Sequence, residues 1–538
     1  MDTGIALNGS TATVVLPLFA AGVLCLVPRR WVARLSVWAA WLVVACALLV
    51  MVKVSTGANI FSHISLIPIT KHPYFASNRL SAVLMIFIAT IGAIVSTFSL
   101  RFLQQDLLNR RYFVASQVLI ASSIAVATAT TLAVLSCAWI IADASFLALL
   151  FYRRELPGVA EALRRTLTYF SIGAIAMVGA VLLVLNRVGN LNITSLGAQH
   201  EALTALGGEA LPVGALLMVA ILIRSAQGPA ARWMPPTVNA PTPVSALLHA
   251  GVVNGGGILL LRIGVLAESS NLVTALAFAI VTITAIVAAL AIRFRSDIKG
   301  ELTISTISQM GFMISEATIG ANLATLMHLL GHGTYKASRF LNSPSAIGKP
   351  SGHNAPAKAN HPPIKTKAIA ALGALVAVSA AYPGASGHRG GLILLGFVAC
   401  TIYVAISNAA RNLAGQPKLI VTIAGATLLG SAAYGAILGG LDRWMSSSLA
   451  VVPSGALSPW WLIVALGVAL GLERLSTIPT LERHLRVWSI NFGSISRHGF
   501  YHIPNTWAKV SPPKTSRRQY QRILMQSESS IEKEEAAA

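Results

Sequence analysis

The 538-residue sequence carries little charge, and most of that charge has one sign. Charged residues make up 11% of the chain, against about 25% in an ordinary soluble protein. Hydrophobic residues account for 55%. They are gathered in runs of about 20 residues, the length that a helix needs to cross a bilayer. These features exclude a soluble globular enzyme and a disordered chain. They also exclude an outer-membrane barrel, whose strands are about 10 residues long and alternate in polarity.

Cysteine is scarce, and the common nucleotide and metal motifs are missing. The four cysteines, Cys25, Cys46, Cys137 and Cys400, lie in apolar runs without a CxxC pair. We therefore expect small buried apolar side chains there, not disulfides or metal ligands. The sequence has no GxxxxGK[ST] loop and no HExxH pair, which argues against an intrinsic ATPase or a zinc site. The prediction is a transporter subunit that holds no cofactor and no metal.

Acidic residues are few, with 18 Asp and Glu against 40 Lys and Arg, so the net charge is +22. The basic residues lie in loops between apolar runs and in the tail, without an aromatic-rich basic fold, so no nucleic acid is expected as a partner. Most of them follow odd-numbered apolar segments. Because basic loops face the cytoplasm, this bias predicts an outside N-terminus and a cytoplasmic C-terminus.

The apolar segments predict an all-α polytopic membrane protein with about 14–15 transmembrane helices. They lie at residues 11–28, 34–54, 79–100, 113–132, 133–152, 165–187, 209–226, 243–266, 271–292, 301–320, 322–342, 366–386, 390–409, 417–440 and 459–475. Residues 343–367, rich in Pro, Asn and Lys, predict a flexible cytoplasmic loop. The basic tail at 479–538 is either solvated or bound to anionic lipid or a partner.

Three ionisable residues recur at helical spacing within one apolar segment. His328, His332 and Lys336 stand at i, i+4 and i+8, which places them on one helix face. Each costs about 2.5–3.5 kcal/mol in a membrane-spanning helix, so such residues are candidates for function. Histidine exchanges protons near neutral pH, and a lysine removed from water releases its proton more readily. The stripe favours a proton pathway over polar packing between helices.

Two more cationic or titratable residues lie near helix-breaking sequences. His249 is followed by Asn254 and by three glycines at 255–257, which permit close helix approach or a local break. Arg224 precedes the pair Gly228–Pro229. That pair indicates either an interrupted helix that lines a cavity or a plain helix end where the arginine reaches the membrane surface.

Two acids and one further histidine complete the candidates. Asp143 lies within a span and is expected to pair with Arg224 or Lys336. Glu316 is either part of the pathway or at the outer end of its span. His388 follows a second Pro–Gly pair, which is either another broken helix or an extracellular loop. We assign all eight residues to an ion pathway.

Two long stretches resemble the proton-translocating module of respiratory complex I and cation/proton antiporters. The first is RSAQGP followed by WMPPTVNAPTPVSALLHAGVVNGGGILLLR, and the second is DIKGELTISTISQMGFM with HLLGHGTYKASRFLNSPSAI. The resemblance covers roughly residues 80–400. It implies two inverted repeats with broken helices, at 113–266 and 267–415, between N-terminal helices at 1–112 and C-terminal helices at 416–478.

The resemblance also implies roles, with some departures. His249, His328, His332 and Lys336 match the central polar axis of the family. Arg224 stands where the first repeat usually has a lysine, and arginine effectively never releases its proton. The acid that the family has directly after a tryptophan is missing, and Asp143, one turn later, is the substitute. No lysine follows the second broken helix, where His388 is the nearest titratable group.

The LLHAGVVNGGG stretch and the short basic tail look most like the membrane subunit of Dab-type inorganic-carbon transporters. This resemblance implies a bacterial cytoplasmic (inner) membrane and a large cytoplasmic partner subunit, carbonic-anhydrase-like and zinc-containing, in a hetero-oligomer. H⁺ or Na⁺ flow would energise CO2 hydration on that partner. Two alternatives stay open: a proton-pumping subunit of complex I (NADH–quinone oxidoreductase) or of a membrane-bound hydrogenase, and a scaffold that moves no ions.

Overall fold

A computed structural model describes residues 9–56, 60–61, 74–156, 158–189, 192–193, 206–292, 297–346 and 417–445, with a few single positions besides. The chain divides into two units, Met1–Ser494 and Ile495–Ala538, and all described residues belong to the first. Within them, the extended elements are the antiparallel pair β1 (Ile60–Phe61) and β2 (Ala76–Ser77) and two isolated bridges. The rest of the regular structure is helical.

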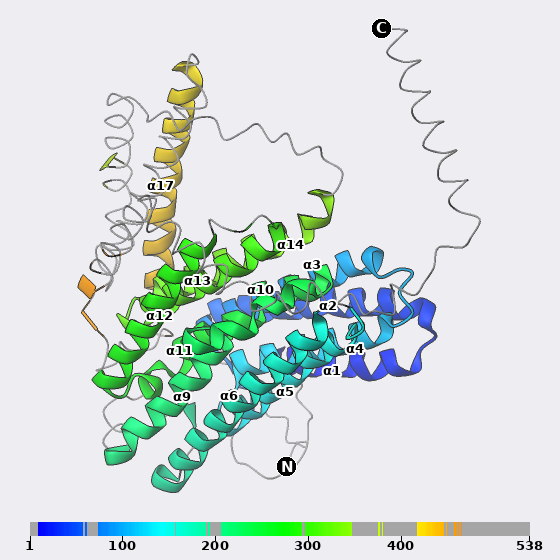
Figure 1. Cartoon of the computed structure of the whole chain (residues 1–538), viewed down its shortest axis with the longest axis horizontal. Coiled ribbons are helices and arrows are strands. Elements are labelled where there is room, and N and C mark those ends of the chain that lie inside the picture. Colours follow the sequence, from blue (N-terminus) through cyan, green and yellow to red (C-terminus); the bar gives the residue numbers. More distant parts are fainter. Residues whose placement is uncertain are drawn as a thin grey trace, which may run out of the picture. The chain divides into compact units, whose positions relative to one another are not determined.

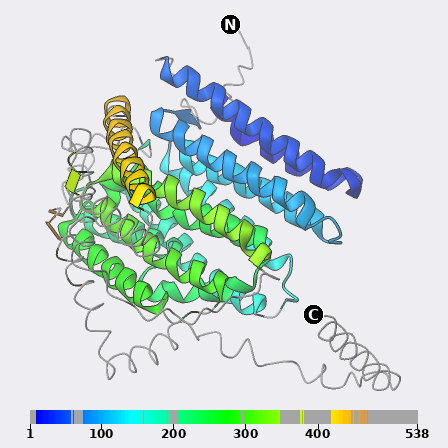
Figure 2. The ribbon, with the colours of Figure 1, turned by 90° about the horizontal axis from the view of Figure 1, so that it is seen from above.

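The helices run side by side through most of the described chain (Figure 1). In chain order they are α1 (Gly9–Leu26), α2 (Arg29–Ser55), α3 (Arg79–Phe102), α4 (Asn109–Thr128), α5 (Leu132–Phe151), α6 (Val159–Val188), α9 (Ala210–Arg224), α10 (Thr242–Ala250), α11 (Gly255–Ala267), α12 (Asn271–Ile292), α13 (Ile298–Thr318), α14 (Asn322–Asn342) and α17 (Pro417–Met445). The 3₁₀ turns are η1 (Gly207–Glu209), η2 (Gly228–Trp233), η3 (Pro235–Asn239), η4 (Val252–Asn254) and η5 (Ser343–Ala346). Figure 2 shows the same ribbon from above.

The prediction of an all-α, multi-pass membrane protein is confirmed. Within the described ranges, nine helical segments are long and apolar enough to cross a membrane, from Gly9–Leu26 to Asn271–Ile292. Each predicted segment from 11–28 to 322–342, and that at 417–440, coincides with a helix or a helix pair. The predicted segments at 366–386, 390–409 and 459–475, and the tail, lie outside the continuously described residues. Of the loop predicted at 343–367, the first four residues form η5.

Side-chain caps explain several helix ends. Asn78 and Ser81 form a reciprocal capping box at the start of α3, and Thr131 accepts from the Val134 N–H at the start of α5. The division near residue 132 is confirmed, since α4 ends at Thr128 and α5 begins at Leu132. Arg262 of α11 donates to the Val126 carbonyl at 3.1 Å and to that of Ala129. These bonds satisfy carbonyls that the end of α4 leaves without helical partners.

The cysteine prediction is wrong for two of the three cysteines in the described part. Cys25 and Cys137 are exposed, Cys46 is half-buried, and all three are free thiols; Cys400 is outside the described residues. The reason is physical: helix faces directed at lipid are as apolar as those directed at protein, so hydrophobic surroundings in the sequence do not predict burial. The exposed side chains of Phe19 and Trp38 illustrate the same point.

The helices are interrupted at two places, after α9 and between α10 and α11. After α9 ends, Ala226 and Gly228 both adopt positive φ, 54° and 56°, and η2 follows. Between α10 and α11, Gly251 departs from helical geometry with φ −123° and ψ −71°. The glycines at 255–257 follow this break and also permit close approach: a Cβ on Gly256 would lie 2.1 Å from the Ser225 Oγ. Of the two alternatives proposed for these glycines, the structure shows the close approach, whereas the break lies before them at Gly251.

Candidate functional site

An ion pair between Arg224 and Asp143 occupies the first interruption. The two residues are only 4% and 5% exposed, and the Arg224 Nη1 contacts the Asp143 Oδ1. The Arg224 Nε donates to the Val252 carbonyl at 3.1 Å, and Nη1 also approaches the Trp139 carbonyl at 3.5 Å. The guanidinium carbon lies 4.2 Å from the centroid of the Trp139 ring, a cation–π contact. Of the two partners expected for Asp143, Arg224 is the one that pairs.

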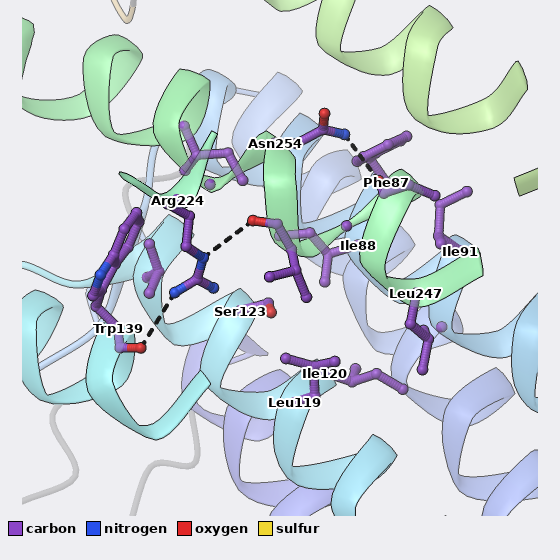
Figure 3. Close-up of a pocket in the computed structure, with 17 residues that line it drawn as sticks. Phe87, Ile88, Ile91, Leu119, Ile120, Ser123, Trp139, Arg224, Leu247 and Asn254 are labelled. Carbon is purple, nitrogen blue, oxygen red and sulfur yellow. Dashed lines mark hydrogen bonds between the residues drawn. The ribbon is translucent and has the colours of Figure 1, made fainter. Parts of the chain in front are cut away.

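Arg224 also lines a small internal cavity (Figure 3). The cavity measures about 40 Å³, enough for about two or three water molecules. Its wall is mostly apolar, with Arg224, Asn254 and Ser123 as the polar side chains. Arg224 is the last residue of α9 and points into the bundle. The interpretation of an arginine that reaches the membrane surface is therefore wrong: α9 ends at Arg224, and the Arg224 side chain is buried and lines the pocket.

His249 lies at the end of α10 and is fully buried. Its ring stacks on Phe340 of α14, with centroids 4.3 Å apart and an interplanar angle of 5°. The Nε2 atom is 3.3 Å from the Thr303 Oγ1, whose own hydrogen goes to the Lys299 carbonyl at 2.8 Å. Because a hydroxyl has one hydrogen, His249 must donate through Nε2. Its Nδ1 is then an acceptor, and it has no partner among the described residues.

Lys336 is held inside the α13–α14 hairpin. The residue is 2% exposed, and its Nζ donates to the Leu302 carbonyl at 2.8 Å and to the Ser305 Oγ. One turn earlier on α14, His332 is 7% exposed, and neither of its ring nitrogens has a partner among the described groups. Buried polar atoms almost always have a hydrogen-bond partner, often an ordered water, and a bound water would satisfy these nitrogens.

His328 and Glu316 lie near the other end of the same hairpin. The His328 Nδ1 is 2.9 Å from the Glu316 Oε2, and the two side chains are only 12% and 5% exposed. The rings of His328 and His332 have centroids 6.2 Å apart. Glu316 thus lies near the end of α13, as one interpretation expected, but it is buried and paired.

The stripe predicted on α14 faces the interior. His332, Lys336 and Phe340 are buried against α10 and α13, whereas Tyr335 and Arg339 on the opposite face are exposed. The structure therefore brings seven of the eight predicted residues into two buried groups: Arg224 with Asp143, and the α13–α14 residues with His249. The eighth, His388, lies outside the described residues. That these residues conduct an ion stays a prediction.

Sequence reasoning missed Thr303 and Ser305, which contact His249 and Lys336. Hydroxyl residues are ordinary in membrane helices, so neither stands out alone. Their spacing in GELTISTISQM puts several hydroxyl groups on α13 opposite the α14 stripe, and this was the available signal. Within the described ranges, no group of three or more His, Cys, Asp or Glu side chains is arranged to hold a metal ion.

Residues 129–410 match the family described as NADH:quinone oxidoreductase/Mrp antiporter, TM. The chain belongs to this family. The family resemblance inferred from the two long stretches is therefore confirmed, and the match includes the Arg224–Asp143 pair and the α13–α14 hairpin.

Among curated members, the chain is similar to the probable inorganic carbon transporter subunit DabB1 of Halothiobacillus neapolitanus, with 32% identity over 280 residues. The probable inorganic carbon transporter subunit DabB of Bacillus anthracis is also 32% identical, over 284 residues. These matches cover 51% and 50% of this chain, and the chain spans about half the length of either relative. The structure titled as the Mrp complex from Dietzia sp. DQ12-45-1b aligns with a TM-score of 0.57 and 20% identity, over 97% of this chain and 60% of that one. It supports the antiporter-family fold.

Proposed function

We propose that this chain is the proton-translocating membrane subunit of an inorganic-carbon uptake complex. The observation that carries the proposal is the row of buried ionisable side chains between α13 and α14, which we call the polar file: Glu316, His328, His332 and Lys336. The similarity to inorganic carbon transporter subunits supports the choice of process.

The polar file covers a large part of the thickness of a membrane. It extends from Glu316 to the Leu302 carbonyl, which accepts from Lys336. These two positions on α13 are separated by about 21 Å at a rise of about 1.5 Å per residue. The hydrocarbon core of a bilayer is about 30 Å thick. One hairpin therefore carries exchangeable groups through about two thirds of that thickness.

The side chains favour protons over Na⁺ as the ion. Two imidazoles and one amine dominate the polar file, and these groups exchange protons. A hard cation needs several oxygen ligands, but the Leu302 carbonyl and the Ser305 hydroxyl already accept from the Lys336 ammonium. The unpaired nitrogens of His332 and the unpaired Nδ1 of His249 are positioned to exchange protons through bridging water.

Arg224 and Asp143 have a different role in this proposal. A guanidinium effectively never releases its proton, so Arg224 is a fixed charge and not a relay. It is held by Asp143, by the Val252 carbonyl and by the Trp139 ring. We therefore assign proton transfer to the α13–α14 hairpin and assign the Arg224–Asp143 pair to holding the broken helices in place.

The partner and the location follow from the proposed process. A large cytoplasmic, carbonic-anhydrase-like subunit would hold zinc and hydrate CO2, while proton flow through this chain would make the hydration one-way. The complex would lie in the bacterial cytoplasmic membrane, with the N-terminus outside and the basic tail in the cytoplasm. This chain would need no cofactor of its own.

Purification from native membranes in mild detergent, with mass and zinc analysis, tests the partner. One large zinc-containing soluble protein is the expected result. About a dozen partners with flavin and iron–sulfur absorbance would instead support a redox-driven pump of the complex I type, which the family description also includes.

The ion pathway is tested with Lys336→Ala. This variant should insert normally but fail to rescue growth at low CO2 and fail to acidify membrane vesicles. Lys53→Ala is the matched control, because Lys53 is exposed near the end of α2. Full rescue by Lys336→Ala would contradict the proposal and support a scaffold that moves no ions.

A further inference from the structure

Glu316 lies one turn inside the end of α13. The helix closes with hydrogen bonds from the Ala321 N–H to the Glu316 carbonyl, at 3.0 Å, and from the Gly320 N–H to the Ala317 carbonyl, at 2.7 Å. Gly320 has φ 78°, as this Schellman closure requires. Glu316 is three residues before the helix cap Ile319, so its Cα is about 4–5 Å below the turn. A carboxyl group at this depth is inside the bundle but close to its surface.

The directions of the two helices bring Glu316 and His328 together. Side chains lean toward the N-terminus of their own helix. On α13 this turns Glu316 away from the α13–α14 turn and into the bundle, whereas on α14 it turns His328 toward the turn. The two side chains therefore converge, and the Glu316 Oε2 and the His328 Nδ1 are 2.9 Å apart. Such a hydrogen bond between a carboxylate and an imidazole is a path along which a proton can move.

An apolar cluster covers the pair on the side of the turn. The cluster, which we call the turn cover, consists of Phe278, Ile319, Ala321 and Ala324 with Phe312 and Leu457 packed against them. The Phe312 ring also contacts the His328 ring, with centroids 5.4 Å apart. The Leu457 N–H donates to the Thr318 carbonyl at 2.9 Å, which fastens this residue to the end of α13. The side chains of Glu316 and His328 keep 5% and 12% of their surface exposed, so access to the pair is narrow.

The other side of the pair leads to the rest of the polar file. The centroids of the His328 and His332 rings are 6.2 Å apart, too far for a direct hydrogen bond but suited to one bridging water. The His332 nitrogens have no partner among the described residues, so they are free to bind that water. Glu316 and His328 are therefore the members of the polar file nearest the α13–α14 turn.

We propose that Glu316 and His328 form the outer proton-exchange site of this chain, reached past the turn cover. The proposal rests on the proposed function and on the orientation predicted from the basic loops. For inward flow, the Glu316 carboxylate takes a proton from water at the turn and forms an O–H bond. That bond breaks as the proton passes to His328 Nδ1. The imidazolium then releases a proton from Nε2 to water on the His332 side, and a flip of the ring, which turns the remaining N–H toward His332 and the unprotonated nitrogen toward Glu316, resets the pair.

Proton flux into right-side-out membrane vesicles containing the full complex tests the site. Glu316→Gln keeps the shape of the side chain but removes the exchangeable proton, and it should lower flux by about tenfold or more. Glu316→Asp should restore a substantial part. Glu268→Gln is the matched control: Glu268 is also buried, but it follows α11, and within the described part of the chain its Oε2 makes no hydrogen bond to the polar file. It should leave flux unchanged.

Chemical rescue tests the side from which the site is reached. Imidazole added outside the vesicles should restore flux in His328→Ala but not in His332→Ala. Only the space left by removing the His328 ring opens toward the α13–α14 turn. The proposal is overturned if Glu316→Gln conducts like the unmodified chain, or if outside imidazole rescues neither variant while Lys336→Ala still abolishes flux. A chain in which Lys336→Ala leaves flux unchanged would instead refute the proposed function. Assembly of each variant with its complex is checked by gel filtration, and Glu316→Asp covers the case in which Glu316→Gln does not assemble.

Discussion

Arg224 and Asp143 come from positions 81 residues apart and form a buried ion pair between α9 and α5. The pair lies at the point where α9 ends, and the same guanidinium binds the Val252 carbonyl in the break between α10 and α11. One side chain therefore joins three helices at two interruptions. Because the charge of arginine is permanent, this junction is suited to holding structure, whereas the titratable groups lie on α13 and α14.

Removing only one partner of this pair should be costly. Arg224→Met leaves Asp143 as an uncompensated buried charge, and such losses destabilise by about 3–5 kcal/mol. The double variant Arg224→Met/Asp143→Leu removes both charges and should recover much of the stability. Thermal unfolding in detergent measures this. Proton flux should persist in the double variant, and its loss from a correctly assembled complex would show that the pair takes part in transfer.

The variant Lys336→Arg tests whether Lys336 acts through its positive charge or through proton exchange. Arginine keeps the positive charge and can still donate to the Leu302 carbonyl and the Ser305 hydroxyl. It does not release its proton, so we expect a stable, assembled complex with no measurable proton flux. Flux into vesicles after an external acid pulse gives the measurement. A Lys336→Arg variant with normal flux would mean that Lys336 has only an electrostatic role.

The α14 stripe could be predicted because the spacing of His328, His332 and Lys336 and the cost of burying charge act along one helix. The pairing of residues on different helices could not be predicted from the sequence. Glu316 meets His328 because of the length of the α13–α14 turn and the lean of side chains along antiparallel helices, which the sequence alone does not reveal. Asp143 had two candidate cations for the same reason.

The predicted burial of the cysteines is the clearest error of the sequence analysis, and lipid contact explains it. Cys25 and Cys137 were expected to be buried because their neighbours are apolar, but both are exposed on the bundle. In a soluble protein the contrast between polar and apolar faces reveals which side of a helix is buried, and in a membrane helix that contrast is weak. The polar residues of α14 kept the contrast, which is why that helix could be oriented correctly.

Gly256→Ala should destabilise the chain. The added Cβ would lie 2.1 Å from the Ser225 Oγ and 3.1 Å from the Ile221 carbonyl oxygen, so the Ser225 hydroxyl would have to rotate away from its present position and the backbones of α9 and α11 would have to separate slightly. Overpacking of this kind costs about 1–3 kcal/mol. Gly22→Ala on α1 is the matched control, because no atom lies within 4 Å of its added Cβ. Thermal unfolding should show a lower midpoint for Gly256→Ala only, and equal midpoints would contradict the close approach.

Asp106 should make part of the stability depend on pH. It lies in the loop between α3 and α4. Burial opposes its ionisation, but hydrogen bonds from the Tyr152 hydroxyl, the Leu108 N–H and the Arg153 guanidinium outweigh this and hold the pKa of Asp106 below its ordinary value. A carboxyl with a lowered pKa stabilises the fold at neutral pH, and this contribution is lost as the pH falls through that lowered pKa.

The comparison of unmodified chain and Asp106→Asn isolates this contribution. At pH 7 the variant should unfold at a lower temperature, because an amide binds Arg153 more weakly than a carboxylate does. As the pH falls from the ordinary pKa of an aspartate toward the lowered pKa of Asp106, the stabilising charge is lost and the two unfolding temperatures should converge. Thermal unfolding between pH 7 and pH 3 measures the difference. A difference that stays constant across this range would show that the charge of Asp106 contributes nothing to stability.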